Sequence, residues 1–132
     1  MKKSIIEIFL QGEDGQLYDE HEKHIYRKYQ DCLIIRGKTI LVPYARAHEF
    51  ICDSNNYPMT ISGIDVFKIN EKGTEPLDIA TFSMEKGETW LNYKKINTES
   101  AISFLREIPT DNEIFIEFVF MTEEKWQRIH PT

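Results

Sequence analysis

The chain contains few cysteines, no long apolar run and no surplus of basic side chains. Its two cysteines, Cys32 and Cys52, follow no secretion signal, because Glu7 interrupts the early apolar stretch. Two such cysteines predict free thiols in a reducing cytoplasm, although the sequence leaves a disulfide between them open. The longest apolar runs have about four residues, whereas a membrane-spanning helix needs about 20. We therefore expect a cytoplasmic protein without a membrane segment.

Acidic side chains outnumber basic ones, with 22 Asp and Glu against 16 Lys and Arg and a net charge of -6. Sequence-independent nucleic-acid binding depends on clustered Lys and Arg, so the composition argues against it, and an anionic membrane would repel the chain. The 132 residues are 41% hydrophobic, which is enough for the core of one domain without disulfides or metals. No repeat, low-complexity tract or linker divides the sequence, which predicts one domain over residues 1–132.

Helical spacing of apolar residues is the first structural signal. It predicts helices over residues 19–37, 43–52 and 98–106. Asn97 or Thr98 can cap the last one. The capping box of Ser4 and Glu7, together with Gly12, favours a further short helix over residues 5–11, although the isoleucines of this segment suit a strand almost as well. The sequence therefore predicts helices at the start, before the middle and near the end of the chain.

Strand-like patterns occupy the middle and the end of the chain. Three segments are rich in β-branched and aromatic residues, at residues 64–69, 77–82 and 114–121. The first two are separated by a polar turn and predict a hairpin. Residues 88–93, which carry Trp90, are assigned to a further extended segment. The last segment is apolar at nearly every position except Glu117, which is typical of a central strand covered by helices. This order predicts an α+β domain with a mainly antiparallel sheet packed against helices.

The densest polar cluster lies between Glu13 and Glu22, where five carboxylates occur without any Lys or Arg. Carboxylates together with His21 and His24 are candidate metal ligands, but these histidines are three residues apart and a zinc-protease helix spaces them by four. We therefore predict no metal site and no cofactor. The same acids suit either a solvated helix start or a surface that binds a basic partner.

The two cysteines are the candidate catalytic nucleophiles, and both fall on predicted apolar helix faces, where a thiol is typically a small core residue. His48 lies four residues before Cys52 on the predicted helix, so their side chains would lie on adjacent turns. A reactive pair of this kind also needs a third group that orients the base, and none is evident. The six glycines form no phosphate-binding motif. We expect no catalytic residue; the alternative is a small hydrolase or ligand-binding domain that uses His48 and Cys52.

Trp90 and Trp126 both lie among charged and polar residues. Large aromatic side chains in such surroundings can anchor a protein interface. A tryptophan can equally close the edge of the core of a small domain. Both interpretations stay open from the sequence.

The order of several features is similar to a known family. These features are residues 41–47 (LVPYARA), residues 61–67 (ISGIDVF), a polar segment with Trp90, a helix through Ala101 and Leu105, and a closing strand with Phe118 and Val119. Over residues 41–121 the chain resembles the immunity protein 40 family of bacterial toxin systems.

This resemblance implies a non-catalytic cytoplasmic protein that binds a cognate toxin protein and neutralises it. The acidic segment and the segment around Trp90 supply the candidate partner-binding residues, which are Asp14, Asp19, Glu20, Glu22, Glu85, Glu88 and Trp90. An acidic surface would speed the encounter with a basic toxin. A permanent homo-oligomer is a further alternative.

Overall fold

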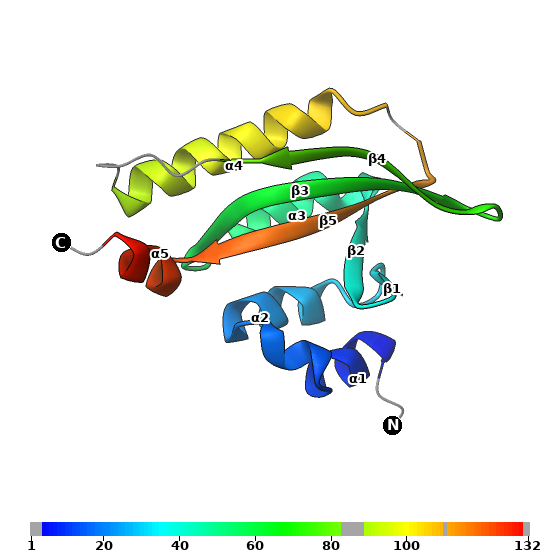
Figure 1. The fold of residues 1–132 in the computed structure, drawn as a ribbon, viewed down its shortest axis with the longest axis horizontal. Coiled ribbons are helices and arrows are strands. Elements are labelled where there is room, and N and C mark those ends of the chain that lie inside the picture. Colours follow the sequence, from blue (N-terminus) through cyan, green and yellow to red (C-terminus); the bar gives the residue numbers. More distant parts are fainter. Residues whose placement is uncertain (1–3, 83–88, 110, 131–132) are drawn as a thin grey trace.

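The computed structural model describes residues 4–82, 89–109 and 111–130 (Figure 1). Two of the candidate partner-binding residues, Glu85 and Glu88, lie outside the described residues. Within the described ranges, helices pack against a five-stranded antiparallel sheet. The predicted α+β fold is confirmed.

The N-terminal part of the chain is helical. It contains three elements, which are α1 (Ile5–Gln11), the 3-10 turn η1 (Asp14–Leu17) and α2 (Glu20–Lys28). The backbone N–H of Glu7 donates to the Ser4 hydroxyl at 3.0 Å, which confirms the predicted cap of the first helix. Asp19 caps α2 in the same way, because its carboxylate accepts the N–H of His21 at 2.8 Å.

The sheet has the strand order β1-β2-β5-β3-β4, with every neighbouring pair antiparallel. Its strands are β1 (Ile34–Arg36), β2 (Thr39–Pro43), β3 (Met59–Asn70), β4 (Gly73–Thr81) and β5 (Ile114–Thr122). The predicted hairpin is confirmed as β3 and β4, which are longer than expected. The predicted central strand is confirmed as β5, which lies between β2 and β3.

Helices supply one side of the core. They are α3 (Tyr44–Ser54), α4 (Trp90–Arg106) and, directly after β5, the short helix α5 (Glu123–Ile129). Phe50 of α3 stacks on Phe118 of β5 with ring centroids 5.1 Å apart, and it also stacks on Tyr26 of α2. Ala101 and Leu105 of α4 join the same buried cluster. Figure 1 shows α3 behind the sheet and α4 alongside β3 and β4.

The long helix predicted from Asp19 to Gly37 is wrong. Helix α2 ends at Lys28, and the chain then turns into the β1–β2 hairpin. Gly37 occupies the hairpin turn with a φ of 61°, a left-handed conformation that favours glycine. The apolar residues near position 33 matched helical spacing by coincidence, while the β-branched Ile34 and Ile35 pair with β2.

The extended segment predicted over residues 88–93 is also wrong in its described part. Trp90 begins α4, and the Thr89 hydroxyl caps this helix by accepting the N–H of Asn92. Asn97, which was expected to cap the helix, lies within it and is buried. Its side-chain amide donates to the carbonyl of Ile61 on β3 at 2.9 Å. A buried polar residue paired to the sheet was thus mistaken for a cap.

Candidate functional site

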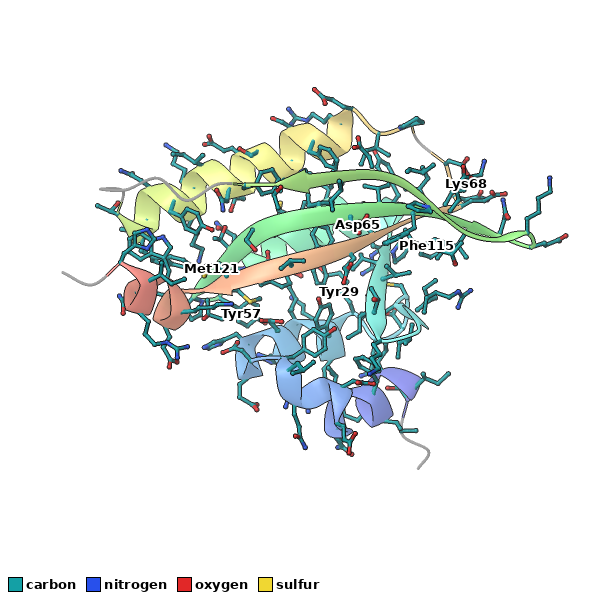
Figure 2. The ribbon with its side chains drawn as sticks, viewed as in Figure 1. Tyr29, Tyr57, Asp65, Lys68, Phe115 and Met121 are labelled. Atoms are coloured by element: carbon teal, nitrogen blue, oxygen red, sulfur yellow. The ribbon has the colours of Figure 1, made fainter. Side chains whose placement is uncertain are left out.

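Most of β5 has no strand beside it on the β2 side. Strand β2 pairs with β5 only at Phe115 and Ile116, whereas β3 pairs with β5 along nearly its whole length. The rest of β2 pairs with β1 instead, and Figure 1 shows it leading away from β5 toward α1 and α2. In the described part of the chain, residues 117–122 therefore have an unpaired edge. Phe115 and Met121 mark the two ends of β5 in Figure 2.

The direction of the backbone groups on this edge follows from one contact. The Ser62 hydroxyl of β3 donates to the carbonyl of Val119 at 3.2 Å, so the backbone of Val119 faces β3. Backbone groups alternate in direction along a strand. The N–H and C=O groups of Phe118 and Phe120 therefore point away from β3, toward the unpaired edge.

A groove of about 580 Å³ lies along this edge, and we call it the β5 groove. Its residues come from η1, α2, β2, β5 and α5, and are Asp14, Leu17, Tyr18, Asp19, Glu22, Tyr26, Lys38, Ile40, Glu117, Phe118, Val119, Phe120, Thr122, Glu124, Lys125 and Arg128. Tyr26 and Ile40 are buried, whereas Leu17 is 86% and Val119 50% exposed. The groove thus combines a strand edge, exposed apolar side chains and charges.

The acidic wall of the β5 groove is held in place by close packing of η1 on α1. Gly15 is buried in η1, and a Cβ at this position would meet the Leu10 carbonyl oxygen at 2.0 Å. Only glycine allows this approach. The neighbouring Asp14 and Tyr18 are consequently fixed at the mouth of the groove.

Negative charge is concentrated on this wall. Burial raises the pKa of Glu22 to about 7, and the carboxylate of Asp19 adds to the shift while Lys125 opposes it. Burial also raises the pKa of Tyr18 to about 12, with further contributions from Glu117, Glu22 and Asp14. Both shifts come first from burial, and the neighbouring carboxylates add to them, so the wall disfavours a further negative charge.

Glu117 adds a carboxylate from the sheet itself. Burial raises its pKa, and Asp65, its direct cross-strand partner on β3, raises it further. Like charges opposite each other on two strands destabilise a sheet. Positive side chains are also present, but they lie mainly on α5, as Lys125 and Arg128.

The structure brings together three of the seven candidate partner-binding residues. Asp14, Asp19 and Glu22 all line the β5 groove, although Asp19 is at the same time the cap of α2. Glu20 is exposed and forms an ion pair with Lys23 at 3.7 Å. Surface pairs of this kind contribute little to stability.

Trp90 lies apart from this group. Its side chain is 8% exposed and packs against Trp126, with ring centroids 5.9 Å apart, and against Tyr93. Met121 of β5 covers the same cluster. Trp90 therefore closes the edge of the core between α4 and α5 and offers little surface to a partner.

His48 and Cys52 are both exposed on α3. The prediction that both cysteines lie on apolar helix faces is wrong, because Cys32 lies in the turn after α2 and Cys52 faces solvent. The Cys32 thiol donates to the carbonyl of Tyr29 at 3.3 Å, and burial raises its pKa. Among the described residues, no three His, Cys, Asp or Glu side chains are arranged to hold a metal ion.

Several residues of the β5 groove escaped the sequence analysis. Tyr18, Val119, Lys125 and Arg128 carry no local signal, because they meet only when β5 and α5 fold against α2. Glu117 did carry one, since it is the one charged residue in an otherwise apolar strand. A charge in such a run indicates a strand face that the core does not cover.

Fold and groove together define an α+β protein with a recessed, unpaired strand edge. Comparisons with protein-family models, with curated proteins and with solved structures found no match for this chain. None of the helices in the described ranges has the length and apolar character needed to cross a membrane.

Proposed function

We propose that this protein is a non-catalytic immunity protein of a bacterial toxin system, which binds its cognate toxin in the cytoplasm and neutralises it. The observation that carries the proposal is the β5 groove, where a strand edge lies beside a wall of carboxylates. Backbone groups that no strand of the described ranges pairs with, exposed apolar side chains and charge within one groove are features of a protein-binding site. The resemblance of residues 41–121 to the immunity protein 40 family supports the same conclusion.

The charge of the chain fits a basic partner. The net charge is -6, and Asp14, Asp19, Glu22 and Glu117 lie together in the β5 groove. A concentrated acidic surface attracts a basic protein over a distance and raises the association rate. A toxin that acts on nucleic acids would present such a basic surface, since its own substrate is a polyanion.

Co-expression tests the proposal. The gene next to the one encoding this chain is expressed from an inducible promoter in a bacterial host, with and without this protein, and colony counts are compared. We expect the neighbouring product to stop growth and this protein to restore it. A His48→Ala/Cys52→Ala variant is expected to protect equally well. Growth arrest that this protein does not relieve would refute the proposal, and loss of protection in the double variant would favour the enzyme alternative.

A further inference from the structure

The unpaired part of β5 is long enough to hold another strand. Residues 117–122 span about 20 Å at about 3.3 Å per residue. Along this length the N–H and C=O groups of Phe118 and Phe120 point toward the β5 groove, as the Ser62–Val119 contact establishes. An added strand would meet four backbone groups that have no strand partner on this side in the described ranges.

We propose that the β5 groove binds an extended segment of the partner protein as a sixth strand beside β5, with a Lys or Arg side chain of that segment placed against Glu22 and Glu117. The identity of the partner rests on the proposed function, whereas the mode of binding does not. Adding a strand to a sheet edge is a general way of recognising extended peptides.

Backbone chemistry favours a strand over a helix as the occupant. A helix satisfies its own backbone groups internally and has a diameter of about 10 Å, so it leaves the groups of Phe118 and Phe120 unmet. A strand lies about 4.8 Å from its neighbour and can bond directly to them. The position at which an added strand could start pairing is also defined, because the pairing of β2 with β5 stops at Ile116.

Side chains of the groove define what the segment should look like. Leu17 and Val119 are exposed apolar groups, and an alternating strand can place apolar residues against them. Glu22 and Glu117 are partly buried carboxylates with raised pKa values, so they gain from a nearby cation. The expected segment therefore alternates β-branched or aromatic residues with Lys or Arg.

A peptide selection tests this inference without the toxin. The full chain is used to select binders from a phage-displayed library of random linear peptides of about 12 residues. Selected peptides are synthesised, and amide hydrogen exchange of the protein is followed by NMR. We expect the amides of Phe118 and Phe120 to exchange at least about tenfold more slowly with peptide bound, while the amide of Ile79 on the outer edge of β4 is unchanged.

Charge reversal is the second arm. The Glu22→Lys/Glu117→Lys variant should bind the selected peptides at least about tenfold more weakly, whereas Asp78→Lys, a matched change on β4, should bind as the wild type does. Circular dichroism and a melting curve establish that each variant is folded. If the double variant does not fold, Val119→Asp replaces it, with the same expected loss.

Two results would overturn the inference: peptides that protect amides elsewhere, or a selection that yields no peptide sensitive to the β5 groove. The two proposals also fail separately. If the charge-reversed variant still protects cells from the toxin, the proposal of an added strand is refuted and the immunity function stands. If peptides bind at β5 but the neighbouring gene product does not stop growth, the strand-addition proposal stands and the immunity function is refuted.

Discussion

Two of the unpaired strand edges of this sheet, those of β4 and β5, are protected in different ways. The outer edge of β4 is exposed along residues 73–79. It carries Pro76, which has no N–H, and a bulge where Leu77 has no partner on β3. The N–H of Ile79 donates to the Asp78 carboxylate at 2.8 Å. Proline, bulges and local capping all prevent a second chain from pairing with an edge.

Between Glu117 and Thr122, β5 has no proline, and the extra residue of the bulge in its pairing with β3, Ser62, lies on β3. The backbone groups of β5 are regular, and only their position inside the β5 groove limits access to them. Strand pairing at the β4 edge is thus prevented by the residues of the strand itself, whereas pairing at the β5 edge is limited by the walls of the groove around it. An edge that is recessed but chemically ready to pair is what selective binding of one extended segment requires.

The largest expected effect comes from proline on the two strands. The backbone of Val119 faces β3, so Val119→Pro removes a ladder hydrogen bond in the centre of the sheet and should cost about 3 kcal/mol or more. The N–H of Ile79 faces away from β3, because the N–H of Phe82, three residues later, donates to the carbonyl of Ser62. Ile79→Pro should therefore cost about 1 kcal/mol or less.

Urea unfolding of both proline variants measures this difference. Equal losses of stability would contradict the assignment of backbone directions on β4 and β5.

Stability should also depend on pH through Glu22 in the β5 groove. Glu22 has a folded pKa of about 7, against an ordinary value of 4.5. As the pH rises from 4.5 to 7, the unfolded chain loses this proton first, so the folded state becomes progressively less favoured. Glu22→Gln removes this effect, so relative to the wild type it should gain about 3 kcal/mol of stability when the pH is raised from 4.5 to 8.

Urea unfolding at the two pH values measures this effect, with Asp78→Asn on β4 as the matched control. A Glu22→Gln variant with the same pH dependence as the wild type would show that Glu22 is not the cause.

Peptide binding should also depend on the titration of Glu22, but in the opposite direction: stability falls as the pH rises, whereas the affinity for the peptide increases. A Lys or Arg beside Glu22 favours the ionised carboxylate, so binding releases a proton wherever Glu22 is protonated in the free protein. The affinity for the selected peptides should rise by up to about tenfold between pH 6 and pH 8. Isothermal titration calorimetry in buffers of different ionisation enthalpy measures the proton release. Identical affinities at both pH values would place the cation elsewhere.

The smallest expected effect concerns β4. Pro76→Val with Asp78→Ala restores an N–H at position 76 and frees that of Ile79, so the outer edge should become able to pair. The stability of the monomer should change by only about 0.5 kcal/mol, since both side chains are exposed. Light scattering over a range of concentrations should reveal self-association of the variant. A strictly monomeric variant would show that something other than these residues protects β4.

Much of the fold follows from local signals in the sequence. The N-cap at Ser4, the helix after Pro43 and the hairpin through Val66 all depend on residues close together in the chain, and the structure has each of them. The apolar run that forms β5 also predicted its central place.

The β1–β2 hairpin and the β5 groove could not be predicted in this way. Cys32 and Leu33 continue the helical spacing that begins at Ile25, and only the pairing of Ile34 and Ile35 with β2 shows that the chain has become a strand. The groove exists because β2 leaves β5 after Ile116 and α2 lies opposite the gap. Its acidic wall was visible as a cluster of carboxylates, but its other walls come from the far end of the chain.

The place of β5 in the chain has a consequence for the order of folding. Strand β5 lies between β2 and β3, yet it is the last strand to be synthesised, and Val42 and Ile116 pair across most of the sequence. Contacts between such distant segments form slowly because a long loop must close first. Until β5 inserts, β2 and β3 both lack their neighbour. The β5 groove, with its α5 wall, therefore forms late, only as folding is completed.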